Sequence, residues 1–468
     1  MTQQQDGATA DGRPKGYNVH TSADVKTMLA VMGLDSVEQL FEDVPPEVRL
    51  TRDLNLPRPL SEWELLRDVQ AMADLNSSTR THASFLGSGA YEHYVPAVVE
   101  AIVSRGEFLT AYTPYQPEMS QGLLQALFEF QVLAGRLLGL ECVNCSVYDG
   151  ATALAESCWM MCCATGKRCI AVPETLWCEY SEVLSTYMAP RGVTILRVPA
   201  DAESGLLDAS AIQVLLARGD MAGVVLQSPN AFGVIEDIAA VAAMCKDQQA
   251  LLCACVNPML CGWLEPPGQS GADIVVCEGQ PLGLTLNAGG PYIGIIACVK
   301  QLERFLPGRL VGRAHDLNGK LGYALVKEDR EQHVARDQAT SHICSNQALN
   351  AIRVAVYLSC LGESNLMRIA LTNAVNARDL QQRLLALPGV KALRSGVFFN
   401  EFSIELSLDA GLFCERMRER GIFAGVLAPP SLTGHARGLL VAVTETKSEA
   451  DIEAYVSHAA DCLSGVAA

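Results

Sequence analysis

The sequence has no apolar run long enough to cross a membrane. Its richest apolar stretch, residues 251–264, is interrupted by Asn257 and Pro258, whereas a membrane-spanning helix needs roughly 20 apolar residues. The N-terminal segment MTQQQDGATADGRPKG also lacks the apolar core of a signal peptide. Charged residues make up only 19% of the 468 residues and apolar residues 49%, which is typical of a folded chain with large cores. We therefore expect a cytoplasmic protein without a membrane anchor.

Positive charge is scarce. The chain has 35 Lys and Arg against 52 Asp and Glu, a formal net charge of −17. Such a chain repels phosphate backbones and anionic lipids, so neither nucleic acid nor a membrane is expected as a partner. The 17 cysteines are spread along the chain without the spacing of a disulfide framework. The motifs G-x-S-x-G, the P-loop and H-E-x-x-H are absent, so hydrolase, P-loop NTPase and zinc-protease functions have no support.

Apolar spacing divides the chain into three parts. Residues 1–80 contain a polar tail and helix patterns that begin near Thr21, Ser36 and Ser61, without an evident core of their own, so we expect a helical arm that lies on another surface. Residues 81–325 alternate β-prone runs with helix patterns, which predicts an α/β domain with a large, mostly parallel sheet covered on both faces. Residues 326–468 are typical of a smaller α+β domain.

Specific elements are predicted in the last two parts. The expected strands of the large domain are Cys169–Val172, Val193–Val198, Gly223–Gln227, Leu251–Val256 and Ile274–Cys277. Its clearest helices are Gln121–Leu138, Ala151–Ala164 and Ile238–Gln248. In the C-terminal part we expect helices over Ala348–Leu361 and Met367–Leu385, and apolar β-prone runs over Val397–Leu406, Ile422–Gly425 and Gly438–Val443.

A turn of small residues lies at the start of the helix that is expected over Ala151–Ala164. Gly150, Ala151 and Thr152 follow Asp149, and the free N–H groups of a helix N-terminus at such a turn form a natural phosphate cradle. Asp149 can instead accept those N–H bonds as an N-cap, and its charge would repel a phosphate. An ordinary helix start and a vestigial phosphate site both remain open on this pattern.

Two loops also have the composition of binding elements. In the segment 112–118, YTPYQPE, two prolines pre-set the backbone while polar and aromatic side chains project from it, which is typical of a recognition loop because little entropy is lost on docking. A plain surface loop with buried tyrosines is the alternative. Gly289 and Gly290 permit positive φ and a close backbone approach, useful beside a ligand or in an ordinary turn.

Cysteine and histidine positions give no metal site. Cys142 and Cys145 have chelate spacing, but no second Cys-x-x-Cys or histidine pair accompanies them, so we predict no metal. A redox role for these two cysteines remains an alternative.

Many segments match one known pattern in the same order along the chain. They are residues 85–96 (FLGSGAYEHYVP), 108–118 (FLTAYTPYQPE), 120–122 (SQG), 128–131 (FEFQ), 148–153 (YDGATA), 227–230 (QSPN), 271–276 (GADIVV), 306–309 (LPGR), 330–333 (REQH), 339–341 (ATS) and 346–349 (NQAL). Over roughly residues 18–460 the chain resembles glycine decarboxylase, the P-protein of the glycine cleavage system. It is most similar to the N-terminal half, which many bacteria make as a separate subunit 1. The resemblance implies the fold of the aspartate-aminotransferase-like enzymes that use pyridoxal 5′-phosphate (PLP).

PLP chemistry of this type needs a lysine amine for the internal aldimine. In this fold the lysine lies just after the strand expected at residues 274–277, where the chain has Gln280 and where no lysine occurs between Lys246 and Lys300. The carboxylate expected to keep the pyridine nitrogen protonated is replaced by Asn257. With Asp149 at the phosphate turn, three requirements of the cofactor fail together. We therefore predict that this chain by itself binds no PLP.

The resemblance implies that catalysis is shared. In the family, the lysine-bearing subunit 2 binds PLP covalently, and the active site lies where the two subunits meet. The reaction (EC 1.4.4.2) releases carbon dioxide from glycine and transfers the aminomethyl group to the lipoyl arm of the H-protein. The T-protein and the L-protein are further functional partners. We expect this chain to contribute loop residues to the shared site, namely Tyr112, Thr113, Tyr115, Gln116 and Glu118, while Gly289 and Gly290 shape the same wall.

Two other functions remain open on the sequence. The chain is either an independent PLP enzyme that uses a displaced lysine such as Lys246 or Lys300, or a non-catalytic scaffold or regulatory paralogue. The chain also departs from the family pattern at Asn257, at His342, where asparagine is expected, and around residues 327–329.

Overall fold

The first part of the chain is a helical segment without a core. The computed structural model describes residues 19–50, 52 and 54–464, and its contacts divide the chain into two units, Met1–Asn76 and Ser77–Ala468. In the first unit, α1 (Ser22–Met32) begins at a capping box and ends at Gly33, whose φ is 72°. Two short 3₁₀ helices, Val37–Phe41 and Pro46–Val48, precede α2 (Glu62–Ala73), which begins at a second capping box.

Burial confirms that this arm has no core of its own. Among the described residues of the first unit, only Leu29 is buried, while apolar side chains such as Phe41, Trp63 and Leu66 are exposed. The expectation that the arm lies on another surface stays a prediction.

A seven-stranded sheet forms the centre of the second unit. The strand order is β2-β8-β7-β6-β5-β3-β4. Neighbours from β7 to β4 are parallel, and β8 pairs antiparallel with both β7 and β2. The strands are β2 (Cys142–Val143), β3 (Cys169–Pro173), β4 (Thr194–Val198), β5 (Met221–Ser228), β6 (Leu251–Val256), β7 (Ile274–Glu278) and β8 (Gly294–Cys298). The predicted mostly parallel sheet is confirmed.

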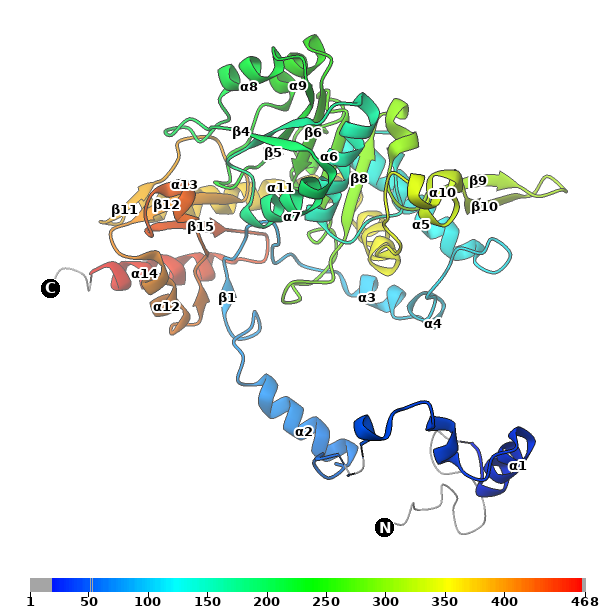
Figure 1. Ribbon diagram of the computed structural model, residues 1–468. Helices are drawn as coiled ribbons and strands as arrows, with labels where there is room; N and C mark the ends of the chain where they lie inside the picture. The colour runs from blue at the N-terminus through cyan, green and yellow to red at the C-terminus, as the bar shows by residue number, and fades with distance from the viewer. Residues whose placement is uncertain (1–18, 51, 53, 465–468) are drawn as a thin grey trace. The chain divides into compact units, whose positions relative to one another are not determined.

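Helices cover both faces of this sheet (Figure 1). Successive residues of β5 enter different cores: Val224 and Leu226 belong to one apolar cluster, and Val225 between them belongs to the other. This alternation is the geometric consequence of a strand. The helices of this part are α3 (Ala97–Val103), α4 (Gly106–Leu109), α5 (Gln121–Leu138), α6 (Gly150–Thr165), α7 (Cys178–Met188), α8 (Ala209–Leu216) and α9 (Ile238–Asp247), with 3₁₀ helices Ala189–Arg191, Leu260–Gly262 and Lys300–Phe305.

A hairpin and short helices connect the sheet to the long helix α11. The hairpin consists of β9 (Val311–His315) and β10 (Leu321–Leu325), which pair antiparallel; in Figure 1 it extends away from the large sheet. The connecting segment then contains α10 (Gln332–Ala335) between the 3₁₀ helices Glu328–Arg330 and Arg336–Gln338. Helix α11 (Ala348–Leu385) is interrupted at Gly362, whose φ and ψ of 65° and 175° are not helical. The two predicted helices therefore meet at a kink.

The C-terminal part forms a smaller α+β layer, as predicted. Its sheet has the order β11-β12-β15-β14. The elements are β11 (Val390–Ala392), β12 (Glu401–Leu406), α12 (Ala410–Arg418), β13 (Ile422–Phe423), β14 (Val426–Leu427), α13 (Pro430–Thr433), β15 (Gly438–Ala442) and α14 (Glu449–Ser464). One strand differs from expectation: β12 begins at Glu401 rather than at Val397. The short β1 (Ala83–Ser84) pairs with β13, so the residues after the arm join this layer.

Within the described residues, no helix is long and apolar enough to span a bilayer.

Candidate functional site

The carboxyl ends of the central strands bring the predicted cofactor residues to one edge of the sheet. Strand β6 ends at Val256, immediately before Asn257, and β7 ends at Glu278, two residues before Gln280. In open α/β sheets this edge is the usual position of a ligand site. The Asp149 turn belongs to the same place, because the N–H of Gly150 donates to Glu278 Oε2 over 3.0 Å.

The phosphate turn is filled by protein carboxylates. Asp149 caps helix α6, with its Oδ1 accepting from the Thr152 N–H at 2.7 Å. The N–H of Gly150 is taken by Glu278, and a Cβ at Gly150 would lie 2.1 Å from Tyr180 Oη. Ala151 lies between these two capped positions. The turn is therefore a capped helix start. Its N–H groups at Gly150 and Thr152 already donate to carboxyl groups of the chain, and this arrangement does not fit a phosphate.

Glu278 is the side chain that sequence reasoning missed here. Its carboxylate accepts from three backbone N–H groups, since Gln280 (3.0 Å) and Ile293 (3.1 Å) donate to Oε1 in addition to Gly150 on Oε2. Burial raises the pKa of Glu278 to about 7, although these hydrogen bonds act in the opposite direction. A glutamate at the end of a buried parallel strand was the available sequence signal.

Gln280, at the expected lysine position, is fully buried and fully bonded. Its exposed fraction is 0%. Its Oε1 accepts from the Tyr91 N–H at 2.8 Å, while Nε2 donates to the carbonyls of Tyr91 (2.9 Å) and Leu284 (2.8 Å). The side chain thus ties the segment around Tyr91 to the end of the sheet. It has neither the amine nor the access that a Schiff base requires.

Asn257 also has protein partners only. Its Oδ1 accepts from the Met259 N–H at 3.0 Å and its Nδ2 donates to Asn400 Oδ1 at 3.4 Å. A neutral amide in this arrangement supplies no negative charge to a pyridine nitrogen. A carboxylate, Glu401, does lie near this region, but it accepts from the Ser88 N–H (2.7 Å) and from Tyr91 Oη (3.0 Å).

Burial raises the pKa of Glu401 to about 7, so Glu401 is a second buried carboxyl group that sequence reasoning missed. Together with the phosphate turn, Gln280 and Asn257, it shows that the residues of this chain do not fit PLP.

The predicted loop 112–118 is divided between an inward tyrosine and outward polar groups. Tyr115 is partly buried; its hydroxyl donates to Asn346 Oδ1 at 2.7 Å, and the Arg309 guanidinium lies 4.0 Å from its ring centre. Burial raises the pKa of Tyr115. Asn346, to which sequence reasoning assigned no role, also donates to the Cys145 carbonyl at 2.7 Å. The other predicted residues of the loop face solvent: Tyr112 (92% exposed), Thr113, Gln116 and Glu118.

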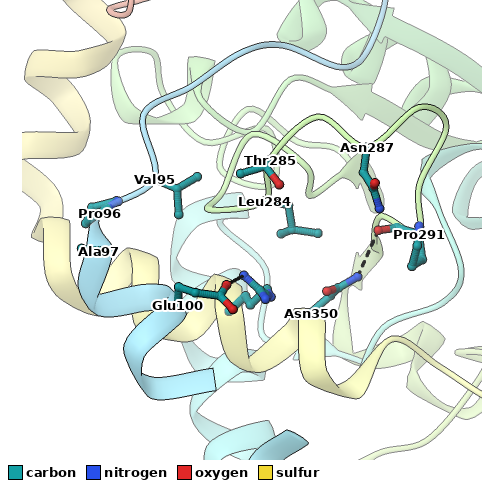
Figure 2. A pocket seen from close by; sticks show the side chains of 10 residues that line it. Val95, Pro96, Ala97, Glu100, Leu284, Thr285, Asn287, Pro291 and Asn350 are labelled. Carbon is teal, nitrogen blue, oxygen red and sulfur yellow. Dashed lines mark hydrogen bonds and ion pairs between the residues drawn. The ribbon is translucent and has the colours of Figure 1, made fainter. Parts of the chain in front are cut away.

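A pocket of about 350 Å³ is lined by Asn287 and Pro291, the residues on either side of the Gly289–Gly290 turn (Figure 2). Both glycines have left-handed φ values, 102° and 118°, which favour glycine. Asn350 of α11 fixes the turn by donating to the Tyr292 carbonyl at 2.8 Å. On the opposite wall, Arg353 and Glu100 form an ion pair at 2.7 Å. The pocket is lined by Val95, Pro96, Ala97, Glu100, Leu284, Thr285, Asn287, Pro291, Asn350 and Arg353.

The two cysteines with chelate spacing have different partners. The Cys145 thiol donates to Gln131 Oε1 at 2.9 Å, whereas Cys142 lies opposite Cys298 in the sheet. Over residues 19–50, 52 and 54–464, no cluster of three or more His, Cys, Asp or Glu side chains is arranged to hold a metal ion.

Comparison with known proteins identifies the family. The family model described as glycine cleavage system P-protein matches residues 16–458. The chain belongs to this family. A relative from Moorella thermoacetica named "Probable glycine dehydrogenase (decarboxylating) subunit 1" is 44% identical over 441 residues, covering 94% of this chain and 98% of the relative. A protein of the same name from Desulfitobacterium hafniense is 43% identical over 444 residues, with the same coverage of both chains.

Solved structures agree with this P-protein assignment. A crystal structure of glycine decarboxylase (P-protein) of the glycine cleavage system, in inhibitor-bound form, has a TM-score of 0.88 and 38% identity; the match covers 96% of this chain and 100% of that one. A sphingosine-1-phosphate lyase from Burkholderia pseudomallei has a TM-score of 0.63 at 15% identity, with 90% and 94% coverage. The predicted PLP-dependent transferase fold is confirmed.

Proposed function

We propose that this P-protein chain is subunit 1 of a heteromeric glycine dehydrogenase (decarboxylating, aminomethyl-transferring). On this proposal a lysine-bearing subunit 2 binds PLP covalently, and the two chains together decarboxylate glycine and transfer the aminomethyl group to the lipoyl arm of the H-protein. The T-protein and the L-protein then act on the product carrier. The similarity over nearly the full length of proteins named subunit 1 supports this assignment.

The single observation that carries the proposal is the closed cofactor position. Gln280 replaces the Schiff-base lysine with a buried amide whose three hydrogen bonds are all made within this chain. Glu278 supplies a carboxyl oxygen at the turn where a phosphate would bind. A chain with this interior contributes to the reaction by completing a site on its partner.

The exposed edge of the loop 112–118 is the surface that we assign to the shared cavity. Tyr112, Thr113, Gln116 and Glu118 present hydroxyl, amide and carboxylate groups to solvent. Tyr115 supports them from below through Asn346 and Arg309. Held in this way, the loop loses little entropy on meeting the partner subunit, so its polar groups can position substrate.

The displaced-lysine alternative is disfavoured by the exposure of both lysines. Lys246 lies exposed in the last turn of α9. Lys300 has a side chain that is 60% exposed and forms an ion pair with Glu303 at 2.9 Å. An exposed, strongly hydrated ammonium is poorly suited to a stable imine.

The test separates the two subunits. Each subunit is purified alone and incubated with PLP. It is then assayed for visible cofactor absorbance and for glycine–bicarbonate exchange with lipoylated H-protein. We expect absorbance in subunit 2 only, and full exchange activity only after mixing. Exchange by isolated subunit 1, or an imine band in it that a Lys246 or Lys300 substitution abolishes, would contradict the proposal.

A second experiment distinguishes a shared site from a docking scaffold. The double variant Tyr115→Phe, Glu118→Gln is expected to keep its affinity for subunit 2 and to lower kcat of the heteromer by at least about tenfold, the equivalent of ~1.4 kcal/mol. Glu129→Gln, at an exposed glutamate of α5, is the matched control and is expected to change nothing. If kcat is unchanged in the double variant, the chain is a scaffold that docks subunit 2, and our assignment of the loop to the shared site is wrong.

A further inference from the structure

Two cysteines lie directly opposite each other at one end of the large sheet. Cys142 of β2 and Cys298 of β8 are cross-strand partners in an antiparallel pair. Directly opposed residues in such pairs have Cα atoms about 4.5–5.5 Å apart, and disulfides form at Cα separations of about 4.4–6.8 Å. The backbone therefore already holds these two residues at a distance that a disulfide can bridge.

The two thiols differ in a way that suits an attacking and a resolving cysteine. A hydrogen bond with the Cys298 thiol lowers the pKa of Cys142; burial and Glu303 act against this, and nearby Lys300 adds to it. Burial and the same contact raise the pKa of Cys298. Because the thiolate is the reactive form, Cys142 is the one that reacts first with an oxidant.

The position of Cys142 in the fold gives a small oxidant a short path. Strand β2 is the edge strand of the seven-stranded sheet. Its neighbours Glu141 and Lys300 are exposed, while the Cys142 side chain itself is 5% exposed. Because Cys142 is so little exposed, a small oxidant such as a peroxide reaches its sulfur far more easily than the disulfide of another protein does.

We propose that Cys142 and Cys298 are a redox modification site that a small hydroperoxide converts into an intrachain disulfide. The Cys142 thiolate attacks a peroxide oxygen, the O–O bond breaks, and a sulfenic acid and hydroxide form. The Cys298 sulfur then attacks the Cys142 sulfur, the S–O bond breaks, and water leaves with the proton of the second thiol. Two thiols are oxidised and one hydroperoxide is reduced to water, or to water and an alcohol.

The disulfide closes a loop that contains most of the large sheet. The enclosed segment runs from β2 through α6 to β8 and includes the Asp149 turn and Gln280. Cross-linking residues that are far apart in sequence restricts the unfolded chain. The oxidised form is therefore expected to unfold at a higher temperature than the reduced form.

The main experiment uses the unaltered chain. Reduced protein is exposed to hydrogen peroxide, alkylated under denaturing conditions, digested and mapped without a reductant. We expect a linked peptide pair containing Cys142 and Cys298, the loss of these two alkylatable thiols, and their return after a thiol reductant. The exposed Cys344 reports that the oxidant has acted. If Cys142 and Cys298 are still alkylated at doses that oxidise Cys344, the proposal is wrong.

Three variants assign the order of events. In Cys298→Ser, the Cys142 sulfenic acid has no resolving thiol and is expected to be trapped by dimedone. In Cys142→Ser, no dimedone adduct is expected at Cys298. Cys145→Ser is the matched control, because its buried thiol bonds to Gln131 instead, and it should form the disulfide as the unaltered chain does. A Cys142–Cys145 link in the unaltered chain would overturn the assignment.

Discussion

Replacing Gln280 by leucine tests whether the position of the missing lysine has become a structural tie. The substitution keeps nearly the same volume but removes the partners of three buried backbone groups, namely the N–H of Tyr91 and the carbonyls of Tyr91 and Leu284. A buried polar group left without a partner costs about 1–3 kcal/mol. Three such groups give an expected loss of at least ~3 kcal/mol in the free energy of unfolding.

The assay is urea-induced unfolding followed by circular dichroism, with equal slopes required for the comparison. Gln213→Leu, at an exposed position of α8, is the matched control and should stay within about 0.5 kcal/mol of the unaltered chain. A loss below about 1 kcal/mol for Gln280→Leu would refute the reasoning, because the segment around Tyr91 would then be held by other contacts.

Three further predictions concern Gln280 and Glu278 at the closed cofactor position and the contact between Tyr115 and Asn346. The single change Gln280→Lys should give the isolated chain no visible imine band with PLP, because Glu278 still occupies the phosphate turn; such a band would contradict the closed site. Burial raises the pKa of Glu278 from 4.5 to about 7, so its stabilisation is complete below pH 4.5 and is lost as the pH rises through about 7. At 1.36 kcal/mol per pH unit this amounts to about 3 kcal/mol. Unfolding measured between pH 5 and 8 should show that decline, and Glu278→Gln should remove this share of it, while Glu401, whose pKa burial also raises to about 7, keeps its own share. Asn346→Ala and Tyr115→Phe remove the same hydrogen bond. Asn346→Ala also removes the hydrogen bond to the Cys145 carbonyl. In the heteromer the double variant should therefore lose no more kcat than Asn346→Ala alone, whereas additive losses would show separate roles.

The sequence predicts those elements whose pattern is local. Helix α5 has the predicted bounds, Gln121–Leu138, because its apolar stripe and the left-handed Gly139 that ends it are both local features. The start of β12 was predicted four residues too early for a non-local reason. The Val397 carbonyl accepts from the Ile235 N–H, and Phe398 forms a bridge with Val234. These contacts hold residues 397–398 against another part of the chain, so the strand of the small sheet begins only at Glu401.

The same distinction holds at the site. Gln280 and Asn257 were identified because the family resemblance implies a lysine and a carboxylate just after two strands that the sequence predicts. Glu278 and Glu401 were missed because their partners are distant: Glu278 binds the N–H of Gly150, 128 residues away, and Glu401 binds the N–H of Ser88, 313 residues away. No local pattern records such contacts; a glutamate at the end of a buried strand can indicate that a partner exists, as at Glu278, but it does not identify that partner.

The polar groups at the strand ends and at the start of α6 are satisfied within the chain. Each polar group that a PLP site would leave for its ligand has a partner in the chain: Glu278 takes the N–H of Gly150, Gln280 takes the backbone of Tyr91, and Asn257 bonds to Asn400. Reopening the site would leave these groups unpaired, and each unpaired group costs about 1–3 kcal/mol. Several simultaneous changes would therefore be needed for this interior to accept a cofactor, which is why the proposed contribution to catalysis is placed on a surface, the loop 112–118.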